Sequence, residues 1–126
     1  MKRVDDPAAH WREKLRPLLL AARKDRDPIR VSALRSALSA IDNAETPDAG
    51  HLDVPSASAI AGSVAGLGAA EVPRRVLTDA EIRTLLRAEI DDRLLAADQI
   101  DAGGHSERAT AVRAGAAVLV DLLGGG

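Results

Sequence analysis

The residue types best suited to bind a ligand are basic, and they gather in one short stretch of the sequence. The set consists of Arg23, Lys24, Arg26, Arg30 and Arg35. Guanidinium and ammonium groups can bind the phosphates of a nucleic acid. No aromatic residue lies among them, so stacking on unpaired bases is not expected. The stretch predicts an RNA-binding surface that contacts phosphates and reads little of the base sequence.

Charge is unevenly distributed around this basic set. Residues 1–41 hold ten Lys and Arg against five Asp and Glu, whereas residues 42–126 hold seven against fourteen. A basic first third on an acidic remainder favours an anionic partner. The alternative is that these charges are solvated helix faces that pair with neighbouring acids, and the sequence leaves both interpretations open.

Metal and cofactor chemistry finds little support in the sequence. The histidines His10, His51 and His105 stand far apart, and none has a second ligand one helical turn away, as a zinc site would require. The glycine-rich stretch at 62–68 lacks both the Gly-Lys-Ser/Thr ending and the preceding strand of a phosphate-binding loop. The absence of cysteine excludes thiolate ligands and a Cys nucleophile. We therefore predict no cofactor and no metal.

Catalytic residues are also not indicated. Three acids between residues 89 and 92 fall within one helical stretch, whereas a carboxylate pair that cleaves glycosides needs a cleft between two elements. Ser32, Ser36 and Ser39 have no His–acid pair near them in the sequence to activate a hydroxyl. We assign no catalytic residue.

Two helices are expected to position the basic set. Apolar residues recur at helical spacing over 8–24, and Pro17 predicts either a kink or a separate turn over 8–16; we favour one kinked helix. Asp27 is a suitable N-cap and Pro28 a suitable first residue for a second helix, which Thr46-Pro47 ends. Because only residues 25–27 separate the helices, they should form an antiparallel hairpin with the basic set at its corner.

Two further helices are expected after residue 76. Thr78 and Glu81 form a capping box for a third helix, which Gly103-Gly104 ends. Its buried face should contain Ile82, Leu86, Ile90, Leu94 and Ala97. Ser106 is expected to be the N-cap of a fourth helix that reaches the final glycines. Residues 46–76 are rich in Gly, Ala, Ser and Pro and predict a long flexible loop, in which 58–67 could form a short helix.

These elements predict an all-α fold, a four-helix bundle-like domain with a long loop between helices two and three. A single domain should span 1–126. Trp11 is the sole aromatic residue, so the core must be largely aliphatic. The predicted core residues are Val31, Leu34, Leu38, Ile41, Ile82, Leu86, Ile90, Val112 and Leu119. A stripe of small residues on helix two would let another helix approach closely; it contains Ala33, Ala37, Ala40 and Ala44.

The sequence also gives an expectation for location. Met1-Lys2-Arg3 is followed by acids rather than by an apolar run, so no signal peptide is indicated. No apolar stretch approaches the roughly 18 residues that a membrane-spanning helix needs. Without cysteines, the composition fits a reducing compartment. We expect a cytoplasmic protein without a membrane partner.

The two expected hairpin helices carry a family resemblance. Residues 22–27 read Ala-Arg-Lys-Asp-Arg-Asp, and residues 32–45 read Ser-Ala-Leu-Arg-Ser-Ala-Leu-Ser-Ala-Ile-Asp-Asn-Ala-Glu. With Leu-Thr-Asp-Ala-Glu at 77–81 and Ala-Gly-Gly at 102–104, they resemble the GatB/YqeY family over about residues 8–123. The stretch 60–75 is similar to an insertion of actinobacterial-type members. The chain departs from the family at Ile100, usually an aromatic, near His105, where Arg is usual, and at Gly115, usually Glu. The family's smaller C-terminal helical domain is expected to be absent.

The resemblance implies an association with transfer-RNA-dependent amidotransferase, in which related domains help to engage the transfer RNA. The implied partners are transfer RNA or an amidotransferase component. The family label further implies carbon–nitrogen ligase activity with glutamine as amide donor. That reaction needs an ATP site, a glutaminase and an ammonia route, which this sequence does not supply. We therefore expect a non-catalytic helical module, or alternatively a protein-interaction module that docks through the alanine stripe or the long loop without RNA.

Overall fold

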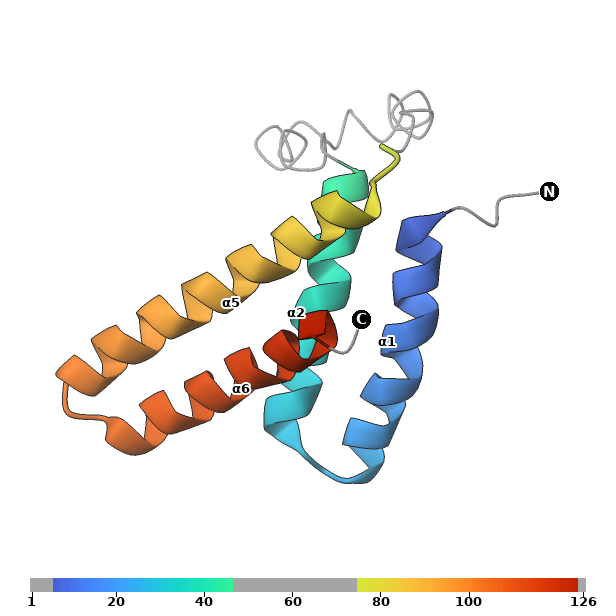
Figure 1. Ribbon diagram of the computed structural model, residues 1–126. Helices are drawn as coiled ribbons and strands as arrows, with labels where there is room; N and C mark the ends of the chain where they lie inside the picture. The colour runs from blue at the N-terminus through green and yellow to red at the C-terminus, as the bar shows by residue number, and fades with distance from the viewer. Residues whose placement is uncertain (1–5, 47–74, 125–126) are drawn as a thin grey trace, which may run out of the picture.

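A computed structural model describes residues 6–46 and 75–124 of the chain (Figure 1). The predicted all-α fold is confirmed, because all four expected helices form and no strand occurs within those two ranges. The helices form two hairpins, and the second crosses the first (Figure 1). Most of the predicted loop, with the short helix expected at 58–67, lies outside the described residues.

The first hairpin consists of α1 (Pro7–Lys24) and α2 (Pro28–Glu45). The Asp6 carboxylate caps α1 by accepting the Ala9 N–H, and α1 runs as one helix through Pro17. Asp27 caps α2 as expected, because its carboxylate accepts the Arg30 N–H at 3.1 Å. At the other end of α2, the Arg75 N–H donates to the Glu45 carbonyl, so the chain re-enters beside the point where α2 ends.

The second hairpin consists of α5 (Asp79–Ala102) and α6 (Ser106–Gly124). The capping box of α5 is confirmed: the Glu81 N–H donates to Thr78 Oγ1 at 3.0 Å, and the Thr78 N–H donates to Glu81 Oε1 at 2.9 Å. The latter bond lowers the pKa of Glu81. Gly104 has φ +91, which explains a glycine after the helix. Ser106 is the first residue of α6 rather than its N-cap, because the Ala109 N–H bonds to the His105 carbonyl.

The core lies where the hairpins cross. Its largest fully buried side chains are Trp11, Leu15, Leu34, Ile41, Ile82, Leu86 and Leu119. Six of the nine predicted core residues are buried, whereas Val31, Leu38 and Val112 are partly exposed. Ala33 and Ala37 have no exposed surface. Half of the alanine stripe is therefore closed inside the domain and cannot receive a partner protein.

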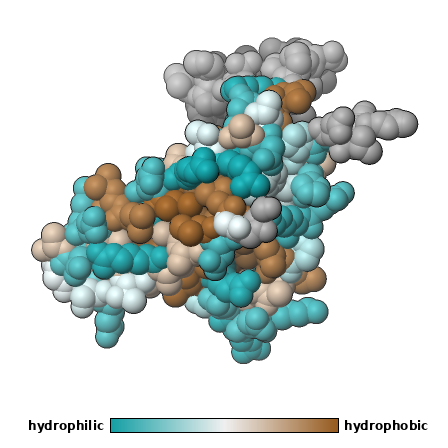
Figure 2. Space-filling model, viewed as in Figure 1, coloured by the Kyte–Doolittle hydropathy of each residue, from teal (hydrophilic) through white to brown (hydrophobic). Residues whose placement is uncertain are grey.

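The predicted buried face of α5 is wrong at Leu94. Leu94 is 41% exposed and its neighbour Leu95 is 60% exposed. The arm formed by α5 and α6 extends beyond α1 and α2, so α5 is covered there on fewer sides (Figure 1). Apolar side chains consequently reach the surface along this arm (Figure 2). None of the four described helices combines the length and the apolar character that crossing a membrane requires.

Gly115 lies inside α6 and is buried. A Cβ atom built there would lie 3.5 Å from Arg93 Nε, which is ordinary van der Waals contact. We expect Gly115→Ala to raise the free energy of unfolding by up to about 1 kcal/mol, since glycine weakens a helix interior. Urea denaturation followed by circular dichroism measures the change. The exposed neighbour Ala114 provides a matched control, because Ala114→Gly should lower stability by a similar amount; a loss of stability in Gly115→Ala would contradict the argument.

Candidate nucleic-acid interface

The turn between α1 and α2 has an unusual backbone. Arg26 adopts φ +55, the left-handed region that glycine favours. Its N–H donates to the Arg23 carbonyl and the Asp27 N–H donates to the Ala22 carbonyl, which closes α1 with the hydrogen bonds of a Schellman motif. Such motifs usually carry glycine at this position, and a side chain there costs about 1–2 kcal/mol. The chain therefore presents an arginine at a position where glycine would be more stable.

Three cations stand exposed at this turn: Arg23, Lys24 and Arg26. Within residues 6–46 and 75–124, none of them forms an ion pair. The acids of the turn form no ion pair with them within the same ranges, and the Asp27 carboxylate instead accepts the Arg30 N–H as the cap of α2. Other arginines form ion pairs with acids: Arg83 with Asp79, Arg93 with Glu89 and Arg113 with Asp98. We call Arg23, Lys24 and Arg26 the corner cations.

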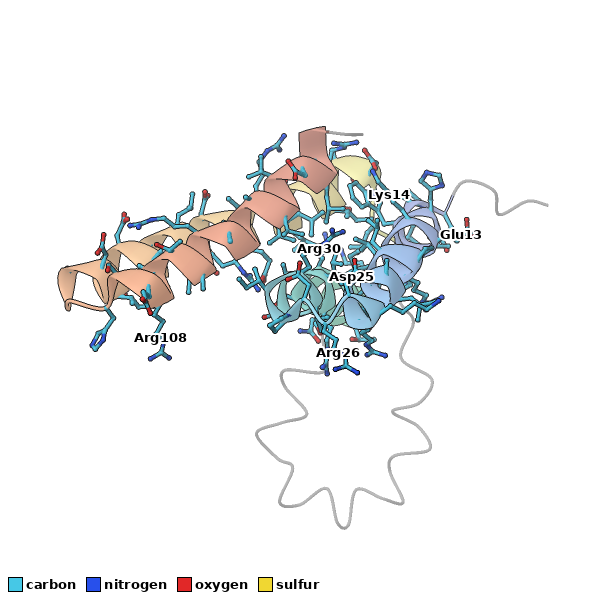
Figure 3. The ribbon with its side chains drawn as sticks, turned by 90° about the horizontal axis from the view of Figure 1, so that it is seen from below. Glu13, Lys14, Asp25, Arg26, Arg30 and Arg108 are labelled. Carbon is cyan, nitrogen blue, oxygen red and sulfur yellow. The ribbon has the colours of Figure 1, made fainter. Side chains whose placement is uncertain are left out.

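The structure does not bring Arg30 and Arg35 to the same surface as the corner cations. Arg30 is half-buried and faces the space between α1 and α6, whereas Arg26 points out of the opposite side of the hairpin (Figure 3). Arg35 lines a groove between α2 and α5. Five residues on an α-helix correspond to a rotation of about 140°, so these two arginines must face different directions. The predicted five-residue surface is therefore divided among three places.

The groove that holds Arg35 has a volume of about 460 Å³, and its lining mixes polar and apolar side chains. It is lined by the three serines that were considered as nucleophiles from the sequence: Ser32, Ser36 and Ser39. Ser36 Oγ accepts a hydrogen bond from Arg93 Nη2 at 2.8 Å, and Arg93 also pairs with Glu89. This serine is thus tied to a structural ion pair, and the described residues that line the groove include no histidine that would activate it.

At the opposite end of the first hairpin, the charged side chains form ion pairs and hydrogen bonds with one another and with neighbouring helices. Arg12 forms ion pairs with Asp42 and with the buried Glu45, and these contacts raise the pKa of Arg12. Trp11 Nε1 donates to the Asp79 carboxylate at 2.7 Å. Hydrogen bonds from Arg83 and then from Trp11 lower the pKa of Asp79. These contacts hold the helices together.

The cations around Trp11 belong to the same structural cluster. Lys14 Nζ lies 4.8 Å from the centre of the indole ring, and the Arg83 guanidinium lies 5.4 Å from it. The ion pairs of Arg12 and the hydrogen bond from Trp11 to Asp79 could not be read from local spacing, because these partners lie 30 to 68 residues away. Lys14, by contrast, is one helical turn from Trp11. In the described part of the chain, no three His, Asp or Glu side chains are grouped as a metal ion would need.

Comparison with known proteins adds no assignment. No protein-family model, curated protein or solved structure matches the chain.

Proposed function

We propose that the chain is a non-catalytic helical module that binds transfer RNA through phosphates at the α1–α2 corner. The observation that carries the proposal is the corner itself, where three cations without ion pairs in the described structure stand on a turn that keeps Arg26 in a glycine conformation. Strained backbone often marks functional positions, because selection retains the side chain despite its cost. The resemblance to the GatB/YqeY family supports transfer RNA as the anionic partner.

In this role the corner cations attract the phosphates of the RNA but do not recognise its base sequence. Each guanidinium or ammonium that binds a phosphate releases condensed counterions, so affinity falls as salt concentration rises. The single aromatic residue, Trp11, is buried and cannot stack on a base. The implied carbon–nitrogen ligase chemistry, with glutamine as amide donor, would belong to an amidotransferase component that shares the RNA.

Transfer-RNA titrations at two salt concentrations test the proposal. Fluorescence anisotropy should show weak binding by the wild type at low salt that declines steeply toward physiological salt. The variant Arg23→Glu/Arg26→Glu should lose most of this affinity, and the dependence of log affinity on log salt should become shallower by about one for each lost contact. The matched control is Arg87→Glu/Arg108→Glu, which changes net charge equally at exposed residues of α5 and α6.

Arg26→Gly separates function from folding. Glycine fits φ +55 without strain, so this variant should be more stable than the wild type by about 1 kcal/mol and yet bind transfer RNA more weakly. A variant that merely unfolds cannot produce this combination. If wild-type binding is undetectable at low salt, or if the corner and control variants bind equally, the proposal fails. The alternative, a module that binds a protein partner, would then be favoured. Of the alanine stripe, only Ala40 and Ala44 could contribute to such an interface.

A further inference from the structure

Arg30 is a charged residue with a buried side-chain atom that has no hydrogen-bond acceptor in the described structure. This atom is the guanidinium Nε. No acid within the described ranges forms an ion pair with its guanidinium. Buried polar groups are normally hydrogen-bonded, and an exception calls for an explanation such as an ordered water, an ion or a functional role. Arg30 therefore differs from the corner cations, whose side chains are in water.

Arg30 lines a cavity of about 360 Å³ between α1, α2 and α6. Lys14, whose Nζ also lies over the Trp11 ring, lines the same cavity from α1, so two cations border it. Figure 3 labels both residues. The remaining walls are mostly aliphatic and are formed by Leu18, Leu34, Val118 and Leu122. Asp121 on α6 is the one acid among the residues that line it. This combination of apolar walls with a few charged groups is typical of small-molecule sites.

The charges define the class of ligand. Lys14 and Arg30 favour oxygen anions, and Arg presents paired donors that match a carboxylate. Asp121 leaves the cavity with a net charge of about +1 from these three groups, which suits a monoanion better than a dianion. The aliphatic walls favour a hydrocarbon portion on the ligand. We propose that this cavity binds a small amphipathic monocarboxylate, with its carboxylate on Arg30 and its hydrocarbon chain against the leucines.

Hexanoate is a suitable probe for the full chain, because it combines one carboxylate with a short hydrocarbon chain. Hexanoate should raise the thermal unfolding temperature in a saturable manner, since a ligand that binds only the folded state stabilises it. Acetate, hexan-1-ol and inorganic phosphate should each produce a smaller shift. Acetate lacks the hydrocarbon chain, hexan-1-ol lacks the negative charge, and phosphate has no hydrocarbon chain and carries more than one negative charge. A phosphate or hexan-1-ol shift equal to that of hexanoate would overturn the assignment, as would no shift with hexanoate.

Variants at the charged positions distinguish a site from simple packing. Arg30→Met keeps an apolar stem and should weaken hexanoate binding, measured by calorimetric titration, by at least about tenfold, since hydrogen bonds to a charged group are lost. Arg30→Gln serves the same purpose should the methionine variant not fold. Asp121→Asn should strengthen binding, because it removes a negative charge that repels the carboxylate. Arg23→Met is the control and should leave binding unchanged.

The hexanoate experiments test the cavity without depending on whether the protein binds transfer RNA. Arg30→Met should retain transfer-RNA binding if the corner cations carry it, so the two proposals can succeed or fail separately. Unchanged hexanoate affinity in both Arg30 variants, or weaker binding in Asp121→Asn, would refute the cavity as a carboxylate site.

Discussion

Replacing Trp11 by alanine is expected to lower the free energy of unfolding by about 3–5 kcal/mol, since a large buried aromatic side chain is removed from the core. Trp11 is 2% exposed and lies in the core at the hairpin crossing. It also contributes polar contacts, because its indole N–H donates to Asp79 and its ring faces two cations. Its substitution therefore removes packing, a hydrogen bond and cation–π contacts together.

Two variants separate these contributions. Trp11→Phe keeps an aromatic ring but loses the N–H donor, so it should cost clearly less than the alanine variant. Asp79→Asn weakens the acceptor and removes the ion pair with Arg83, and should cost about 1 kcal/mol because the Asp79 side chain is half exposed. Circular dichroism in urea provides a common measurement, since the Trp11 variants have no indole fluorescence. A loss below about 1.5 kcal/mol for Trp11→Ala would show that the core closes around the missing ring.

Features with local causes could be predicted from the sequence. The N-cap at Asp27 and the capping box at Thr78 and Glu81 depend on residues within one turn of each other, and both form as expected. The hairpin of α1 and α2 follows from a connection too short for another arrangement. Periodicity identified most of the core, but Leu94 shows its limit. A period indicates which side chains share a face, not how far the neighbouring helices extend along it.

The candidate sites depended on three-dimensional placement that spacing does not give. Arg30 and Arg35 follow the corner cations in sequence, yet the rotation of α2 sends them to different surfaces. The cavity around Arg30 needs side chains from α6, nearly ninety residues later. Nothing in the residue type of Arg26 indicates a left-handed backbone, since glycine is the usual choice there. The basic stretch of the sequence thus combined residues from three separate environments.

Arg12 is expected to show the second large effect. Its side chain is 15% exposed and pairs with Glu45, whose side chain is 8% exposed, and with Asp42. Arg12→Leu removes the guanidinium from a buried carboxylate and should lower the free energy of unfolding by about 3 kcal/mol. This value lies at the lower end for a buried pair, because Asp42 is largely in water and the other contacts of Glu45 remain. Arg16→Leu, one turn later on the same face of α1 but at an exposed residue without an ion pair in the described ranges, is the control and should change stability little.

A double-mutant cycle tests whether the loss comes from the charge left behind. Arg12→Leu/Glu45→Leu removes both buried charges and should recover part of the stability lost in the single variants, because a buried ion pair can be replaced by apolar side chains at little cost. Strictly additive losses would contradict this account. Glu45 is also the last residue of α2, and its carbonyl accepts the Arg75 N–H at 2.9 Å where the chain re-enters the domain. Hydrogen exchange at the Arg75 amide should accelerate in Arg12→Leu more than exchange in the middle of α5, because the ion pair fixes the end of α2 that holds this amide.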